Sequence, residues 1–127
     1  MKSLPALLQG VVTHYQGNGR KFGYPTANIA SQTKLQDGVY FGYADLDVYV
    51  HHPAVIFIGT PTTVGDTERR VETHLFDIVD HDYYGEKIKV KVMAFHRANK
   101  TFGSIEELLD AMKEDEAAAR LWAGLSL

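Results

Sequence analysis

The stretch from Lys87 to Ala94 reads Lys-Ile-Lys-Val-Lys-Val-Met-Ala and alternates polar and apolar residues more regularly than any other part of the chain. Successive side chains of a β-strand point to opposite faces of the sheet. The pattern therefore predicts a strand with its three lysines on one face, which is typical of a water-facing side or an edge strand. The residues expected on the opposite, apolar face are Ile88, Val90, Val92 and Ala94.

Several short runs upstream of this stretch predict further strands. They are rich in β-branched and aromatic residues, and turn signals such as Asp37-Gly38 separate them. Most of the chain is therefore expected to be antiparallel sheet. The predicted strands are 11–15, 26–29, 38–46, 48–50, 54–58 and 71–78.

The C-terminal part changes to a helical period. Ser104-Ile105-Glu106-Glu107 forms a capping box, with Ser104 as the N-cap and Glu107 at the third helical position. The apolar residues that follow recur at helical spacing and should pack on the sheet. They are Ile105, Leu108, Leu109, Met112, Ala119 and Trp122.

About six short strands followed by one helix predict a mainly β fold. We expect a small closed antiparallel β-barrel, with a Greek-key-like order of strands and a C-terminal α-helix. The length of 127 residues fits a single domain spanning 1–127, large enough to bury a core without disulfides.

Composition excludes several classes of protein. The chain has no cysteine, which rules out a disulfide framework and thiolate zinc sites. Its 13 Lys and Arg against 16 Asp and Glu give a formal net charge of −3, which disfavours a nucleic-acid-binding surface. No apolar run approaches the length of a membrane span, so we expect a cytoplasmic protein that does not enter a membrane.

A glycine-rich stretch, Gly17–Asn28, is a candidate phosphate site. Its three early glycines let backbone N–H groups turn towards an anion, and Arg20 adds positive charge. The alternative is a glycine-rich surface loop that leads into an ordinary strand. The residues alone slightly favour the alternative, because the stretch is neither a Walker A motif nor a dinucleotide fingerprint.

The same stretch ends in a pair of oxygen-bearing side chains. Pro25 biases the chain towards extended geometry, so Thr26 and Asn28 should lie on one face of a strand. Two neutral hard oxygens beside a phosphate site suit a Mg²⁺–nucleotide complex, since Mg²⁺ takes few protein ligands.

Glu72 is the candidate catalytic carboxylate. It lies in a β-rich run between Val71 and Thr73, where a carboxylate is either exposed or used. Phosphoryl transfer to an alcohol needs a group that accepts the hydroxyl proton. The alternative is a solvated glutamate on the outer face, which the sequence alone favours because most glutamates are exposed.

The segment Gly19–Asn28 resembles the Gly-Arg-x-x-Gly-[aromatic or aliphatic]-Pro-Thr-Ala-Asn signature of riboflavin kinases. Further segments resemble the motifs of the same family in the same order, with matching spacing, over nearly the whole chain. They are Val55–Thr60, Glu72–Asp77, Asp82–Gly85 and Arg97–Leu108.

This resemblance implies an enzyme that uses ATP and Mg²⁺ to convert riboflavin into FMN, releasing ADP. Glu72 would be the base for the riboflavin 5′-hydroxyl, and Thr26 and Asn28 would hold Mg²⁺ and the phosphates. The residues implied at the nucleotide are Gly17, Gly19, Arg20, Gly23, Thr26, Asn28, Leu75, Asp77 and Tyr84. Those implied at the flavin are Arg97, Lys100 and Phe102.

Three positions depart from the family pattern. Tyr15 stands where the family usually has glycine, Pro61 comes one position early after the Ile-Gly turn, and Asn99 replaces an acidic residue. A relative that binds flavin or nucleotide without catalysis is therefore an alternative to the kinase. The chain also has no room for the adenylyltransferase domain fused to many bacterial riboflavin kinases, so we expect the kinase module alone, acting as a monomer.

A second alternative is an OB-like barrel that binds single-stranded nucleic acid through stacking aromatics. Tyr40, Phe41 and Tyr43 are the aromatic residues that would serve it. The acidic charge balance argues against this interpretation.

Overall fold

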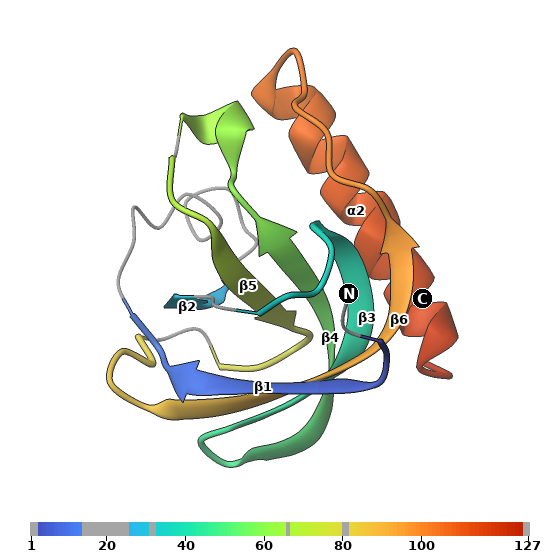
Figure 1. Ribbon diagram of the computed structural model, residues 1–127. Coiled ribbons are helices and arrows are strands. Elements are labelled where there is room, and N and C mark those ends of the chain that lie inside the picture. Colours follow the sequence, from blue (N-terminus) through green and yellow to red (C-terminus); the bar gives the residue numbers. More distant parts are fainter. Residues whose placement is uncertain (1–2, 14–25, 31–32, 66, 80–81, 126–127) are drawn as a thin grey trace.

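The fold is a six-stranded antiparallel sheet that curls into a nearly closed barrel, with one helix along its outside (Figure 1). The computed structural model describes residues 3–13, 26–30, 33–65, 67–79 and 82–125. The expected barrel with a C-terminal helix is confirmed. Its elements are β1 (Ala6–Val11), β2 (Ala27–Ala30), β3 (Gly38–Leu46), β4 (Tyr49–Gly59), η1 (Thr62–Val64), β5 (Arg70–Leu75), β6 (Lys87–Arg97) and α2 (Ile105–Trp122).

The strand order is β1-β6-β3-β4-β5-β2, so the first two strands of the sequence form the two ends of the sheet. These ends approach each other just beyond β1, where Thr13 forms an isolated antiparallel bridge with Asn28. The Thr13 N–H donates to the Asn28 carbonyl at 2.7 Å. This bridge nearly closes the barrel and brings the start of β2 beside the end of β1.

The barrel core confirms most of the alternation in β6. Ile88, Val90 and Val92 are buried, whereas Lys87 and Lys89 are exposed. The prediction that Ala94 shares the buried face is wrong. The register against β3 shifts between Phe41 and Gly42, which places one extra residue in β6 and turns Ala94 towards α2.

β4 is one strand of 11 residues, although the sequence predicted two short strands separated by His51-His52-Pro53. Proline lacks an N–H and normally interrupts a strand that has neighbours on both sides. Pro53 is paired with Tyr43 of β3, but pairing with β5 begins only at Ala54. The proline is therefore tolerated where β4 has one neighbour in the ladder.

Two other strand boundaries differ from the prediction. The first strand is Ala6–Val11, earlier than the predicted run of 11–15. β5 ends at Leu75 because Asp77 takes a left-handed turn conformation, with φ of 58°. A strand that continued to residue 78 would need extended backbone at Asp77.

The N-cap of α2 at Ser104 is confirmed, but the Glu107 side chain binds the residue before the cap and not Ser104 itself. Ser104 Oγ accepts the Glu107 N–H at 3.2 Å, and Glu107 Oε2 accepts the Gly103 N–H at 3.1 Å. Ala119 packs with Phe41 and Phe76 in a second core on the outside of the sheet. No helix among the described residues is long and apolar enough to span a bilayer.

We predict that Gly42→Ala strongly destabilises the barrel. A Cβ at this position would lie 1.9 Å from the Lys91 carbonyl oxygen, so β3 and β6 would have to separate. The free energy of unfolding should fall by roughly 1–3 kcal/mol or more, measured by urea denaturation. The matched control is Gly10→Ala, whose Cβ would meet Ile29 at an ordinary 3.5 Å. Equal stability of the two variants would contradict the prediction.

Candidate active site

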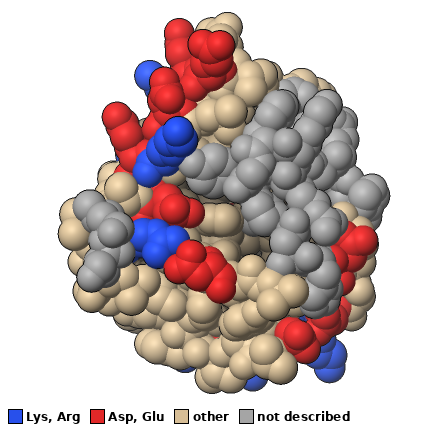
Figure 2. Space-filling model, turned by 180° about the vertical axis from the view of Figure 1, so that it is seen from behind, with Lys and Arg blue, Asp and Glu red and all other residues tan. Residues whose placement is uncertain are grey.

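A cavity of about 330 Å³ is bordered by β2, β3, β4, β5, β6, α2 and the loop after β4. Figure 2 views the molecule from behind and shows charged side chains of both signs gathered on the α2 side of this face, beside a hollow. Two residues of the apolar stripe of α2, Leu108 and Met112, line the cavity. These residues therefore do not serve only to pack the helix on the sheet.

One row of cross-strand partners runs across five strands along the cavity. It lies on the face of the sheet opposite Val71 and Leu75, which are in the barrel core. Neighbouring strands are about 4.8 Å apart, so three spacings separate the second and fifth members by about 14 Å measured along the curved sheet. The row, which we call the cavity row, is Asn28, Glu72, Phe57, Val39 and Arg97.

Thr26, Asn28 and Glu72 lie together at one end of the cavity row. Thr26 Oγ1 is 3.1 Å from Asn28 Oδ1 and 3.2 Å from Glu72 Oε1. The Thr26–Asn28 contact is the one that the i, i+2 spacing predicts. The pairing of β2 with β5 brings Glu72 to the same place. Local spacing could not predict this contact, because Thr26 and Glu72 are 46 residues apart in the sequence.

Arg70 holds the other oxygen of Glu72, and the sequence reading missed it. Its Nε donates to Glu72 Oε2 at 3.4 Å, and its side chain is 5% exposed against 16% for Glu72. An arginine two residues before a strand carboxylate, on the same face, is the signal that could have identified it. Arg70 therefore orients Glu72 from one side while Thr26 contacts it from the other.

The donor set at this end suits a hard cation that keeps most of its shell for water and phosphate oxygens. Hydroxyl, amide and carboxylate oxygens converge within 3.2 Å of Thr26 Oγ1. The described residues contain no group of three or more His, Cys, Asp or Glu that could hold a metal by itself. The three oxygens near Thr26 are few and mostly neutral, which fits a metal that arrives with a phosphate ligand.

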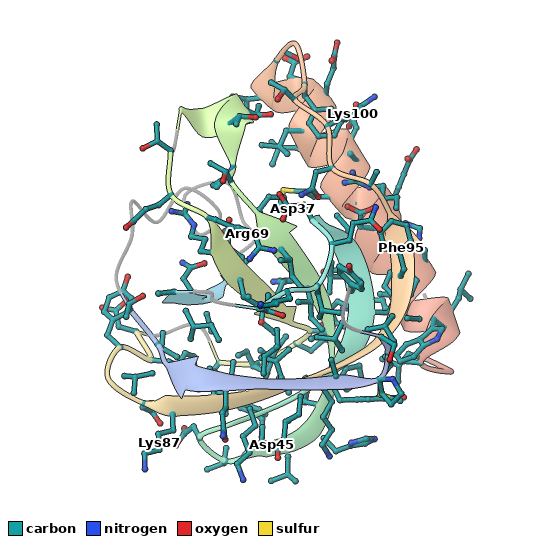
Figure 3. All side chains as sticks on the ribbon, in the orientation of Figure 1. Asp37, Asp45, Arg69, Lys87, Phe95 and Lys100 are labelled. Carbon is teal, nitrogen blue, oxygen red and sulfur yellow. The ribbon has the colours of Figure 1, made fainter. Side chains whose placement is uncertain are left out.

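The other end of the cavity row is cationic and aromatic. The guanidinium of Arg97 lies 5.9 Å, and the ammonium of Lys100 5.0 Å, from the centre of the Phe102 ring. All three residues line the cavity, as the resemblance implies for a flavin site. Lys100 lies beside the start of α2, at the end of the molecule opposite Lys87 and Asp45 (Figure 3).

Asn99, one of the departures from the family pattern, ties two loops together. Its Nδ2 donates to the Ile58 carbonyl at 2.9 Å. Gly59 has a φ of 152°, and a Cβ on it would lie 2.5 Å from Asn99 Nδ2. Phe102 N–H also donates to Thr63 Oγ1 at 3.0 Å, so the segments 58–63 and 97–102 form one rim of the cavity.

Asp115 and Glu116 of α2 extend the site to β6 and β5, and the sequence analysis did not identify them. Asp115 is 4% exposed and binds Arg97 with both oxygens, at 2.8 and 2.7 Å. Glu116 Oε1 lies 2.9 Å from His74 Nε2. Asp115 falls between Met112 and Ala119 in the apolar stripe, and a carboxylate at such a position was the available signal.

The remaining site residues separate into three groups. Leu75 and Tyr84 line the cavity. Asp77 does not line it, and instead binds Arg120 through both oxygens at 3.0 and 2.9 Å, which lowers the pKa of Asp77. The predicted phosphate-loop residues and Tyr15 lie outside the described part of the chain. These loop residues are Gly17, Gly19, Arg20 and Gly23.

The chain is similar to known proteins in both sequence and fold. Residues 3–123 match the family model of riboflavin kinase, also called flavokinase. The human riboflavin kinase is 33% identical over 130 residues, covering 95% of this chain and 84% of that protein. The solved riboflavin kinase of Trypanosoma brucei superposes with a TM-score of 0.67 at 25% identity, covering 90% of this chain and 74% of that one.

Another relative is much longer than this chain. The trifunctional protein RibF/MnmA of Mycoplasmoides gallisepticum is 37% identical over 118 residues, and the match covers 91% of this chain. The chain spans only 18% of the length of that relative. The shared part is therefore one module of a larger protein in that organism.

We predict that the His74–Glu116 pair stabilises the fold in a pH-dependent manner. The hydrogen bond from His74 is the main cause that lowers the pKa of Glu116 below its ordinary 4.5. A carboxyl with a lowered pKa in the folded state stabilises above its unfolded pKa, and this contribution disappears as pH falls through the folded pKa. Glu116→Gln should therefore reduce the free energy of unfolding by roughly 0.5–1.5 kcal/mol at neutral pH.

The measurement is urea denaturation at neutral pH and at about pH 3.5, where the difference from wild type should shrink. Glu114→Gln, at an exposed position on the same helix, is the control and should change little at either pH. A deficit of Glu116→Gln that stays constant over this range would argue against the pair.

Proposed function

The chain belongs to the riboflavin kinase family, and we propose that it phosphorylates riboflavin with ATP. In this proposal, Glu72 accepts the proton of the riboflavin 5′-hydroxyl as the γ-phosphate is transferred. The products are FMN and ADP. The observation that carries the proposal is the convergence of Thr26, Asn28 and Glu72 at one end of a cavity row that ends in Arg97.

Glu72 suits the role of general base because its carboxylate is held from two sides. Arg70 binds one oxygen, and the Thr26 hydroxyl lies 3.2 Å from the other. Phosphoryl transfer through a loose transition state depends more on how the attacking oxygen is aligned than on how strong a nucleophile it is. A carboxylate with a fixed direction can both accept the proton and orient the hydroxyl.

Thr26 and Asn28 supply the protein oxygens for Mg²⁺ and the nucleotide phosphates. When bound, Mg²⁺ neutralises charge on the β- and γ-phosphate oxygens. Asn28 is the cross-strand partner of Glu72, so the metal ligands and the base lie side by side. Arg20 and the backbone of Gly17, Gly19 and Gly23 complete the phosphate site in this proposal, with Leu75 and Tyr84 nearer the rest of the nucleotide.

The acceptor lies along the cavity row, with its hydroxyl at Glu72 and its ring system near Arg97. Riboflavin is a long molecule in which a five-carbon chain separates the reactive hydroxyl from a flat three-ring system. Three strand spacings, about 14 Å along the curved sheet, leave room for a molecule of that shape. Phe57 and Val39 offer an apolar surface in between, and Arg97, Lys100 and Phe102 border the rings.

We further propose that the chain acts as a monomer in the cytoplasm and binds neither nucleic acid nor membrane. A net charge of −3 supports the absence of a nucleic-acid surface. The non-catalytic binding barrel is the competing function, and retention of Glu72 between Arg70 and Thr26 favours catalysis over it.

We predict that Glu72→Gln lowers kcat by roughly 10²–10⁴-fold, because glutamine keeps the shape but cannot accept the proton. Nucleotide affinity should change little. Formation of FMN is followed by chromatography, and nucleotide binding by calorimetry. Glu68→Gln, at an exposed position before β5, is the control and should retain wild-type turnover. Wild-type turnover by Glu72→Gln would remove Glu72 from the mechanism.

We also predict that Thr26→Ala weakens the binding of the Mg²⁺–nucleotide complex. The substitution removes one of the oxygens expected at the metal, so the affinity for Mg²⁺–ATP should fall more than the affinity for ATP alone. The affinity is measured by titration with Mg²⁺–ATP, and with ATP in the presence of a chelator. Loss of affinity that is the same with and without Mg²⁺ would contradict a role at the metal. Thr67→Ala, at an exposed position, is the control.

A further inference from the structure

We propose that Asp115 is a positioning residue for the acceptor: it holds the guanidinium of Arg97 in the orientation that binds the flavin ring system. This inference rests on the proposed function, because it assumes that Arg97 contacts the acceptor. It adds a residue on α2 that lies outside the quoted motifs of the sequence and acts on the substrate through Arg97.

The geometry of the pair is that of a fixed fork. Arg97 Nε donates to Asp115 Oδ1 at 2.8 Å, and its NH2 group donates to Oδ2 at 2.7 Å. The NH1 group donates to the Ala98 carbonyl at 3.2 Å. A planar guanidinium with one edge bound to a carboxylate has its plane and direction set. These three hydrogen bonds use one N–H each of Nε, NH1 and NH2. The second N–H of NH1 and that of NH2 are the two that could donate to a ligand.

Asp115 itself is held in place. Its Oδ1 also lies 3.2 Å from His96 Nε2, and the His96 ring stacks on Phe41 at 4.5 Å between centroids. Phe41 belongs to the core between the sheet and α2. The orientation of Arg97 is therefore fixed by the packing of the helix, because Asp115 has little freedom to move.

Stability alone is a poor reason for this carboxylate. Asp115 is 4% exposed and occupies a position in the apolar stripe of α2. Burying an ion pair is costly, and well-packed apolar residues often stabilise a fold as well or better. Both Asp115 and Arg97 line the cavity. Burial of the Asp115–Arg97 pair costs desolvation free energy, and the pair lies beside a binding cavity. We therefore infer that Asp115 orients Arg97 towards the ligand.

The position of Arg97 also affects the segment that follows it. Residues 97–102 form one rim of the cavity, and the Phe102 ring lies 5.9 Å from the Arg97 guanidinium. The base, Glu72, lies three strands away along the cavity row. Loss of Asp115 should therefore weaken acceptor binding and leave the nucleotide site and the proton transfer largely intact.

The test is steady-state kinetics and riboflavin binding, measured by flavin fluorescence, for Asp115→Asn. We expect the KM and the dissociation constant for riboflavin to rise roughly tenfold or more. The KM for ATP should stay within about twofold of wild type, since the nucleotide site is distant. Asp110→Asn, at an exposed position on the same helix, is the control. A folded Asp115→Asn variant with unchanged riboflavin KM and affinity overturns the proposal, as does an equal rise in both KM values.

A double-mutant cycle with Arg97→Ala shows whether Asp115 acts through Arg97. In the Arg97→Ala background, Asp115→Asn should weaken riboflavin binding no further. A second additive loss would mean that Asp115 acts independently of Arg97, and would overturn the proposal. Asp115→Glu keeps the charge with one more methylene, and should give a riboflavin KM between those of wild type and Asp115→Asn. If Asp115→Asn does not fold, the same cycle is carried out with Asp115→Glu.

Failure of the kinase proposal gives a different result. A wild-type chain that binds riboflavin but forms no FMN contradicts the proposed reaction, while the binding measurements still decide the role of Asp115. A wild-type chain that does not bind riboflavin overturns both.

Discussion

The position of β5 between β2 and β4 is the constraint on which the site depends. Pairing with β2 places Glu72 beside Asn28, and pairing with β4 places it beside Phe57. Because β5 pairs with β2 over Arg70–Thr73 and with β4 over Arg70–Leu75, the base, the metal oxygens and the apolar surface keep fixed spacing. The rest of the barrel holds these three strands in register, and the bridge between Thr13 and Asn28 fixes the short β2 at its far edge.

α2 is linked to β6 and β5, near the two ends of the cavity row, by its carboxylate side chains. Adjacent residues of the helix bind different strands, since Asp115 holds Arg97 of β6 and Glu116 holds His74 of β5. One turn later, Arg120 binds Asp77 in the turn after β5. The helix therefore does more than cover the second core, because its carboxylates also fix side chains that border the cavity.

Local patterns predicted the barrel, the helix and the closeness of Thr26 and Asn28, since each depends on spacing along one element. The parts that could not be predicted depend on pairing between distant segments. The bulge that turns Ala94 outward arises from its register with Phe41, and Pro53 is tolerated because β5 begins to pair one residue later. The contact between Asp115 and Arg97 similarly requires knowledge of where α2 packs, although a carboxylate in an apolar stripe hinted at a buried partner.

The most direct test of the account is the identity of the product formed by the wild-type chain from riboflavin, ATP and Mg²⁺. Chromatography with mass spectrometry should detect FMN phosphorylated at the 5′ position and ADP in equal amounts, and a chelator of Mg²⁺ should abolish both. Bound riboflavin without any FMN, or hydrolysis of ATP without phosphorylated flavin, would contradict the account.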